Sequence, residues 1–222
     1  ITLKDLLFTN YYKDTKKEFI KNKFDSYSSS QIKELLRVLN NIETKKPKKI
    51  NMKKIALIGL RGAGKSTLGN MYCREFKIPI FEITNEIEKI GGLSISEIIE
   101  LGGQGMYRRL EYNAIYNLSK KHKKLLILTG GSLVSEEETF NFLLKNFYTI
   151  WIKAKPKEHM DRVIKQGDLR PISSNPKAMD DLNNILKERE SLYAKADAVV
   201  NTENKDKATA YDILKKKLKI SV

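Results

Sequence analysis

Short apolar runs alternate with longer amphipathic stretches along most of this chain. Five of the runs have the length and the apolar content of buried strands. They lie at residues 54–58, 78–83, 124–129, 147–153 and 198–201. The stretches between them are long enough for helices, and such alternation is typical of a parallel sheet with helices on both faces. We therefore predict a three-layer α/β fold with a parallel five-stranded sheet over residues 54–222.

Signals for helix starts fall between these runs. Ser94 with Glu97, and Ser135 with Glu138, have the spacing of a capping box, in which each side chain binds the other residue's backbone N–H. These pairs predict helices that begin at residues 94 and 135. We also expect two separate helices, over 94–101 and 106–121.

Residues 1–53 show a different pattern. Apolar side chains recur there at helical spacing, at Ile32, Leu35, Leu36 and Leu39. A lysine-rich run with one proline, residues 45–49, then ends the predicted helix. An apolar stripe of this kind docks on a neighbouring domain or on a second copy of the chain, which makes a homodimer one option. We interpret residues 1–53 as a helical linker before the α/β domain.

The composition limits the class of protein. A chain of 222 residues holds one α/β domain and a small appendage. No apolar run approaches the roughly 18 residues of a membrane span, so we expect no membrane partner. The single cysteine, Cys73, excludes a disulfide within the chain and fits a reducing cytoplasm. We interpret Cys73 as a small core residue.

The charge is strongly positive and unevenly distributed. The formal net charge is +15, and residues 1–54 hold 14 lysines and arginines against 6 aspartates and glutamates. A segment of this density can approach nucleic acid or an acidic membrane surface. A solvated, lysine-rich face explains the same composition, so charge alone identifies no partner.

The strongest chemical signal follows the first apolar run, where residues 59–69 have the sequence GLRGAGKSTLG. This fits the P-loop pattern, with Gly59, Gly64, Lys65 and Ser66 at its fixed positions. Glycines let the backbone N–H groups point inward, and the positive end of the next helix adds to the anion site. Lys65 can reach the β- and γ-phosphates of a nucleotide, and Ser66 can offer its hydroxyl to Mg²⁺.

Ligands of an open parallel sheet bind beyond the carboxyl ends of its strands. The P-loop, residues 82–85 and residues 130–132 all follow predicted strands, so we expect them to share one crevice. Cations for phosphate or acid binding are available at Arg108, Arg170 and Arg189, and residues 166–176 have the composition of a mobile lid. Each of these arginines could instead be an ordinary surface charge. The pair Gly130-Gly131 could instead form an ordinary tight turn.

The order of these motifs resembles the shikimate kinase family. The motifs are Gly59–Ser66, Tyr107–Glu111, Thr129–Gly131, Arg170-Pro171 and Arg189–Tyr193. The resemblance implies a fold of the nucleoside monophosphate kinase type, ATP and Mg²⁺ as cofactors, and shikimate held by arginines and glycines.

The resemblance also implies roles for individual residues. Lys65 and Arg170 would be catalytic if the chain is a kinase, and Ser66 would bind Mg²⁺, with Glu82 a second candidate. The implied nucleotide-binding residues are Gly59, Arg61, Gly62, Ala63, Gly64, Lys65, Ser66, Thr67, Arg170 and Asn201, with Thr202 also near the adenine. The implied substrate- or effector-binding residues are Glu82, Thr84, Arg108, Gly130, Gly131, Ser132 and Arg189.

Two positions depart from the shikimate kinase pattern. The family carries Asp-x-Asp at the end of the second strand, and alignment through Glu86-Ile87-Glu88 places Glu82 and Thr84 there. Thr84 cannot accept a proton as a carboxylate does. Ser132 replaces the third glycine of the family's Gly-Gly-Gly. Both changes argue against full kinase activity.

A second resemblance covers blocks such as ALIGLRGAGKSTLG, NEIEKIGGLSISEI and GGQGMYRRLE. These look like the shikimate kinase-like effector domain of benzoyl-CoA-responsive regulators, which carry a helix-turn-helix domain of the XRE family. The resemblance implies that Ile1–Leu7 is the tail of an upstream DNA-binding domain. It also implies that the domain binds benzoyl-CoA or a related aryl-CoA, and that DNA is bound only through that upstream domain.

Three hypotheses follow. The first is an effector-sensing domain of a transcriptional regulator of aromatic-compound degradation, in which ligand binding shifts the linker helix. The alternative is an active kinase that converts shikimate and ATP to shikimate 3-phosphate. The third is ATP hydrolysis without a phosphoryl acceptor. Thr84 and the basic linker favour the first hypothesis over the second.

Overall fold

The computed structural model describes residue 28, residues 54–165 and residues 178–219. The chain divides into two units, Ile1–Lys49 and Ile50–Val222, and the description below concerns the second unit. The apolar stripe within residues 32–39 and the predicted lid with Arg170 lie outside the described residues. The predictions made for them, including the linker and the homodimer, therefore stay predictions.

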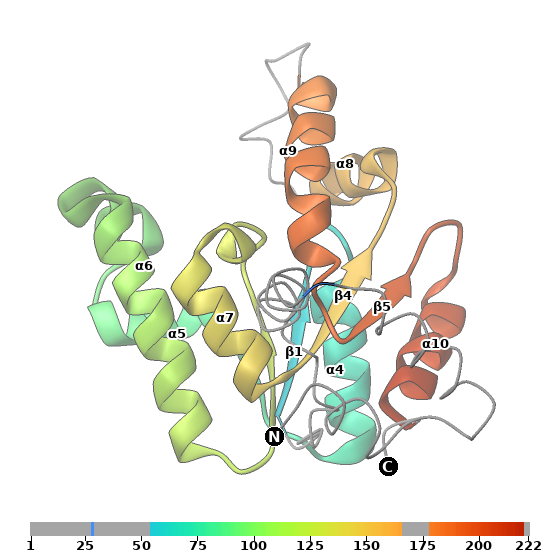
Figure 1. Cartoon of the computed structure of the whole chain (residues 1–222), viewed down its shortest axis with the longest axis horizontal. Coiled ribbons are helices and arrows are strands. Elements are labelled where there is room, and N and C mark those ends of the chain that lie inside the picture. The colour runs from blue at the N-terminus through green and yellow to red at the C-terminus, as the bar shows by residue number, and fades with distance from the viewer. Residues whose placement is uncertain (1–27, 29–53, 166–177, 220–222) are drawn as a thin grey trace. The chain divides into compact units, whose positions relative to one another are not determined.

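A five-stranded parallel sheet forms the centre of the domain, as predicted (Figure 1). Its strands are β1 (Lys54–Ile58), β2 (Ile80–Glu82), β3 (Leu125–Leu128), β4 (Tyr148–Lys153) and β5 (Ala198–Asn201). The spatial order is β2-β3-β1-β4-β5, with Leu57 of β1 in register with Leu128 on one side and Ile150 on the other. Because β1, β3 and β4 are paired on both edges and covered on both faces, they are almost wholly apolar.

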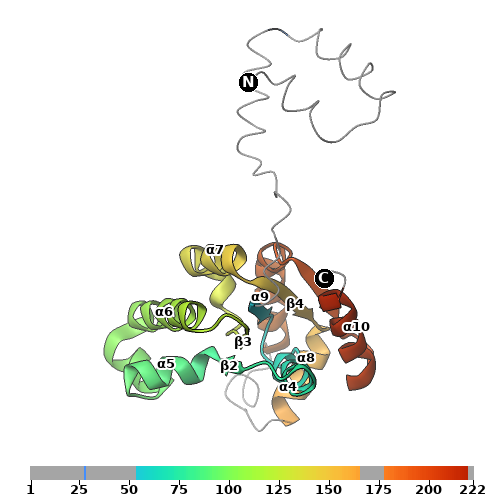
Figure 2. The same ribbon diagram turned by 90° about the horizontal axis from the view of Figure 1, so that it is seen from below.

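Helices cover both faces of this sheet (Figure 2). The helices are α4 (Lys65–Phe76), α5 (Ile83–Gly91), α6 (Ile95–Lys121), α7 (Glu137–Asn146), α8 (Pro156–Lys165), α9 (Ala178–Tyr193) and α10 (Lys207–Lys219), with a 3-10 turn η1 at Leu133–Ser135. Helices α4 and α10 pack on one face, and helices α5, α6 and α7 pack on the other. The three-layer prediction is confirmed.

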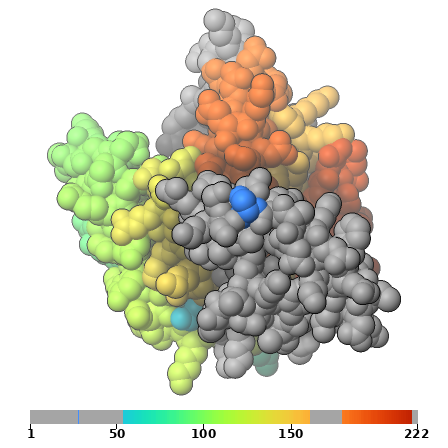
Figure 3. Space-filling view, viewed as in Figure 1, coloured from blue at the N-terminus to red at the C-terminus, as the bar shows by residue number. Residues whose placement is uncertain are grey.

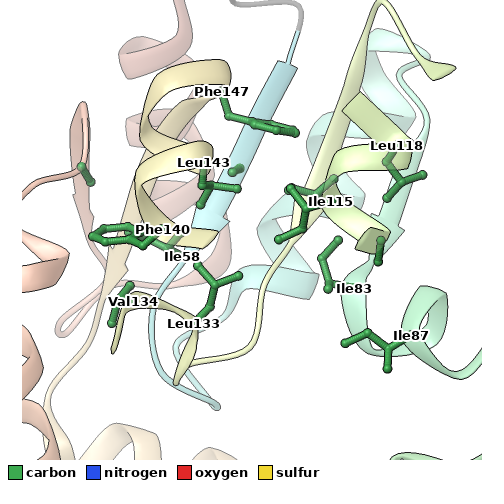
Figure 4. Close-up of a cluster of buried hydrophobic side chains, with 14 of the residues drawn as sticks. Ile58, Ile83, Ile87, Ile115, Leu118, Leu133, Val134, Phe140, Leu143 and Phe147 are labelled. Atoms are coloured by element: carbon green, nitrogen blue, oxygen red, sulfur yellow. The ribbon is translucent and has the colours of Figure 1, made fainter. Parts of the chain in front are cut away.

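Two apolar clusters hold these layers together. The larger cluster lies between the sheet and α5–α7, where Ile115, Leu133, Phe140 and Leu143 meet (Figure 4). The smaller lies under α4 and α10. Cys73 of α4 is buried in this second cluster, and burial raises the pKa of its thiol to about 11. A thiol that stays protonated at neutral pH fits the predicted role of a core residue.

The region predicted as two helices forms α6, which consists of two helical segments joined at a kink. Gly103 has φ 65° and ψ −176°, a conformation that only glycine adopts readily, and the helix resumes after it. The capping box at the start of α6 is confirmed, because Ser94 Oγ accepts from the Glu97 N–H and Glu97 Oε2 accepts from the Ser94 N–H. The prediction of two helices is therefore confirmed in substance, because the two helical segments meet at the non-helical Gly103.

The second predicted capping box, Ser135 with Glu138, is wrong. Ser135 ends the 3-10 turn η1, so α7 begins at Glu137 with Glu136 at its N-cap. The side chain of Glu136 makes no cap hydrogen bond to the helix. It pairs with Arg108 on α6 instead. Helix α7 therefore begins without a side-chain cap, and its N-cap residue forms a long-range ion pair.

Helices α6 and α7 lie side by side, as the adjoining green and yellow atoms in the space-filling view show (Figure 3). Tyr112 and Tyr116 of α6 pack against Phe142 of α7, with ring centroids 5.5 and 5.8 Å from the Phe142 ring.

Within the described part of the chain, no helix combines the length and apolarity needed to cross a membrane.

The packing of β3 predicts a large effect of truncation there. Ile127 is completely buried, so Ile127→Ala should lower the free energy of unfolding by about 2–5 kcal/mol, measured by urea denaturation. Leu101→Ala is the control: Leu101 is 74% exposed, and its loss should change stability by less than about 0.5 kcal/mol. Similar losses in both variants would contradict the described core.

Candidate functional site

Three strand ends bring the predicted site residues together. Strand β1 runs into the P-loop, β2 ends at Glu82, and β3 runs into Thr129 and the turn at 130–132. Because β3 pairs with both β1 and β2 in parallel, all three ends lie at the same edge of the sheet. The three strand ends therefore converge as predicted, and the ligand crevice predicted at this edge stays a prediction.

The backbone of the P-loop depends on glycine at its first position. Gly59 has φ 137°, and a Cβ placed on it would lie 2.5 Å from the Ile152 carbonyl oxygen of β4. Gly62 and Gly64 also have positive φ, 76° and 99°. Gly64 is the N-cap of α4 and offers no side-chain cap. The first N–H groups of a helix are otherwise left without partners inside the helix, so this end of α4 suits an anion.

Lys65 turns its ammonium back onto the loop. Its Nζ donates to the carbonyl oxygens of Gly59 at 2.7 Å and Leu60 at 2.9 Å. Burial lowers the pKa of Lys65 to about 8, with Glu82 acting in the opposite direction and Arg61 in the same one. A cation that is so poorly solvated gains from an arriving anion, because an opposite charge favours its protonated form.

Ser66 and Glu82 form a pair of hard oxygen donors. Ser66 Oγ, in the first turn of α4, donates to Oε1 of Glu82, the last residue of β2, at 2.7 Å. Hydroxyl and carboxylate oxygens are ligands that Mg²⁺ accepts. In the described ranges, no group of three or more His, Cys, Asp and Glu side chains could hold a metal. The donor set therefore fits a Mg²⁺ that shares its coordination with nucleotide phosphates and water.

Helix α8 contacts the P-loop, and the segment after β5 contacts α8 and the end of β4. The ring of His159, which is almost fully buried, lies with Nδ1 2.9 Å from the Arg61 carbonyl oxygen. Glu158 accepts from the Asn204 N–H at 2.8 Å. Thr202 Oγ1 donates to the Lys153 carbonyl at the end of β4. Asn201 and Thr202 are thus placed at the carboxyl ends of β4 and β5, as expected for residues near a bound base.

Arg108 lies at the other end of the crevice. Its Nη1 donates to Glu111 Oε2 at 2.8 Å, and its Nη2 donates to Ser132 Oγ at 2.9 Å. Its Nε lies 3.0 Å from Glu136 Oε1. The Arg108 guanidinium is therefore surrounded by two carboxylates and one hydroxyl. They belong to Glu111 of α6, Glu136 at the start of α7 and Ser132 in the turn after β3.

Arg189 and Tyr193 of α9 converge on the same turn. Tyr193 donates its hydroxyl hydrogen to the Gly131 carbonyl at 2.6 Å, and Arg189 Nη1 approaches that oxygen at 3.4 Å. Tyr193 is fully buried and stacks on Trp151 with a centroid distance of 5.4 Å. Burial raises the pKa of Tyr193 to about 12, so it remains a donor at neutral pH.

Glu111 is an unusual feature of this end of the site. It is completely buried, and burial raises the pKa of its carboxyl against the opposing effect of Arg108. A Cβ placed on Gly130 would lie 3.7 Å from both Glu111 Oε1 and the Tyr107 hydroxyl. Gly130 therefore gives access to two polar oxygens beneath the turn.

The predicted residues divide into three groups. The P-loop, Ser66, Glu82, Arg108, the 130–132 turn and Arg189 lie where expected. Thr84 lies partly exposed in the first turn of α5, and Arg170 lies outside the described residues. Four contributors were missed by the sequence analysis: Glu111, Glu136, His159 and Tyr193. Glu111 and Tyr193 belong to the quoted motifs, whereas Glu136 and His159 carried no local signal.

Comparison with known proteins agrees with this geometry. A family model described as Shikimate kinase matches residues 61–219. The chain belongs to the shikimate kinase family. The shikimate kinase of Aquifex aeolicus (strain VF5) is 34% identical over 161 residues, which cover 72% of this chain and 94% of that protein.

Solved structures of shikimate kinases share the fold. The shikimate kinase from Acinetobacter baumannii, solved in complex with shikimate, has a TM-score of 0.64 at 25% identity and covers 75% of this chain and 90% of that chain. The shikimate kinase from Bacteroides thetaiotaomicron has a TM-score of 0.67 at 24% identity, with 74% and 97% covered. ATP and Mg²⁺ are the cofactors that membership of this family implies.

The names of these relatives lend no support to the regulator hypothesis. The relatives named above are shikimate kinases, and none of their names refers to benzoyl-CoA. The findings thus favour the kinase alternative over the effector domain that the sequence analysis placed first.

Two glycine substitutions test the described P-loop. Gly59→Ala should lower the free energy of unfolding by at least about 2 kcal/mol, because its Cβ would collide with the Ile152 carbonyl at positive φ. Gly105→Ala is the matched control, since a Cβ there points into open space on α6, and helix propensity should raise stability by up to about 1 kcal/mol. Thermal and urea unfolding measure both, and equal effects would refute the close approach at Gly59.

Proposed function

We propose that this chain is an ATP-dependent small-molecule phosphotransferase of the shikimate kinase type, with shikimate as the first acceptor to test. The observation that carries the proposal is the arrangement of Lys65. A poorly solvated ammonium lies inside a P-loop, next to an uncapped helix N-terminus and the Ser66–Glu82 pair. Such a group is suited to bind the transferred phosphate.

In this proposal, one group of site residues binds the nucleotide with its Mg²⁺, and another group binds the acceptor. The P-loop N–H groups and Lys65 would bind the β- and γ-phosphates, and Ser66 and Glu82 would hold Mg²⁺. When bound, Mg²⁺ neutralises charge on the phosphates. Arg108, Arg189 and the 130–132 turn would bind the acceptor. Phosphoryl transfer depends mainly on positioning and electrostatic stabilisation, so these fixed donors can contribute much of the catalysis.

A second candidate function has one specific observation in its favour. Thr84 stands where the family pattern has a carboxylate, so the acceptor hydroxyl lacks that general base. A site that binds ligands without efficient transfer suits the effector domain of a transcriptional regulator, with benzoyl-CoA as a candidate effector. In that case residues 1–53 would connect the domain to a DNA-binding unit. A coupled kinase assay beside calorimetric titration with MgATP, shikimate and benzoyl-CoA separates the two functions.

The lowered pKa of Lys65 predicts proton uptake on nucleotide binding. Below pH 7 the ammonium is already charged, whereas near pH 8 about half of the empty sites carry a neutral amine. Bound phosphates raise this pKa again, so MgATP should take up about half a proton near pH 8, and its affinity should fall as the pH rises further. Calorimetry in buffers of different ionisation enthalpy measures the uptake.

Two lysine variants test this prediction, one in the P-loop and one as a control. Lys65→Met should weaken MgATP binding by at least about 100-fold and abolish the proton uptake. Lys123→Met removes an exposed lysine from the segment before β3 and should change neither. Unchanged nucleotide affinity in Lys65→Met would mean that the P-loop does not bind nucleotide through this side chain.

Thr84 gives a test of the kinase itself. Thr84→Asp supplies a carboxylate in the first turn of α5, just after β2, and should raise kcat for shikimate phosphorylation by about 10- to 100-fold, within the range of general-base catalysis. Asn85→Asp, at the next and exposed position, is the control and should leave kcat within about twofold. If neither wild type nor Thr84→Asp phosphorylates shikimate while benzoyl-CoA binds, the effector function is preferred.

A further inference from the structure

Glu136 is the residue at the acceptor end of the crevice that the proposed phosphotransfer does not use. It lies at the N-cap of α7, and its Oε1 is 3.0 Å from Arg108 Nε. Its side chain is 38% exposed, against 19% for Arg108 and 0% for Glu111. Glu136 is therefore the solvent-facing carboxylate of the pair that flanks the guanidinium.

The pairing changes the charge that an entering ligand meets. Arg108 and Arg189 bring two positive charges to the turn at 130–132, and Glu111 and Glu136 bring two carboxylates to Arg108. A ligand carboxylate that binds Arg108 must displace Glu136 or lie beside it, and like charges at close range disfavour that complex. An uncharged polar ligand meets no such repulsion.

Ser132 also makes Arg108 less available to a ligand carboxylate. Its hydroxyl accepts from Arg108 Nη2 at 2.9 Å, so each of the three guanidinium nitrogens already faces a protein oxygen. A carboxylate gains most from arginine when it forms two parallel hydrogen bonds with it. The Ser132 and Glu136 contacts involve Nη2 and Nε, the two nitrogens of one such bidentate arrangement, so a carboxylate that binds in this way must displace Glu136.

We infer that Glu136 sets the charge specificity of the acceptor pocket, so that the pocket disfavours free carboxylic acids relative to uncharged polar ligands such as esters, amides and polyols. Glu136 is a positioning residue in this role, because it acts through Arg108. The inference rests on the proposed function only in placing the acceptor beside Arg108 and Gly131.

A purely structural role for Glu136 predicts a different pattern. A carboxylate at a helix N-terminus stabilises the helix through its dipole, and loss of that effect would weaken all ligands alike. Glu138 lies exposed in the first turn of the same helix and shares the dipole effect. Glu138→Gln is therefore the matched control for Glu136→Gln.

The experiment is a fluorescence titration of the full chain with shikimate and with its uncharged methyl ester. Trp151 is the only tryptophan, and it stacks on Tyr193, whose hydroxyl binds the Gly131 carbonyl, so its emission reports on the pocket. Glu136→Gln should bind shikimate about tenfold more tightly than wild type, while affinity for the ester changes by less than about twofold. Glu138→Gln should match wild type for both ligands.

The outcomes separate the inference from the proposed function. Glu136→Gln binding shikimate no more tightly than wild type, including no measurable binding by either, overturns the inference. Equal gains for acid and ester overturn it as well, because charge is then not the cause. Should Glu136→Gln fail to fold, the wild type decides: a preference for shikimate over its ester of more than about tenfold refutes the inference. Turnover of MgATP is measured separately, and its absence refutes the kinase without affecting these ratios.

Discussion

The approach of Gly59 to the backbone of β4 is the constraint on which the rest of the site depends. Only a residue without a Cβ can lie against the Ile152 carbonyl in this conformation. That contact fixes where the chain leaves β1, and hence where the P-loop carbonyls and the N-terminus of α4 lie. Lys65 binds two of those carbonyls, Gly59 and Leu60, so the position of its ammonium follows from the same contact.

The two ends of the crevice are built on different physical principles. In the proposed function, the phosphate end would rely on backbone groups and one poorly solvated cation, which any polyphosphate can use. The acceptor end relies on side chains, with Arg108 held between Glu111, Ser132 and Glu136. Tyr193 and Trp151 then connect this turn to β4 by a hydrogen bond and a stacked pair. If the proposed function holds, general affinity for phosphate would come from the sheet edge, and selectivity for the acceptor from the helices around it.

The sequence was informative wherever a local pattern carried the structure. The strands, the P-loop and the Ser94–Glu97 capping box follow from periodicity and spacing within a few residues. It was uninformative where partners lie far apart in sequence. Nothing in the spacing shows that Glu136 faces Arg108. The capping signal at Ser135 was misleading because Ser135 belongs to the 3-10 turn that precedes α7. His159 was missed because its partner is a backbone carbonyl of another element.

The place of Glu136 in the fold has an evolutionary consequence. It stands at the start of a helix, outside the sheet and outside both apolar clusters. Exchanging it alters the charge beside Arg108 without disturbing the packing that holds the P-loop in position. A lineage built on this scaffold can therefore change which ligands it admits, or give up turnover altogether, through substitutions that leave the architecture intact.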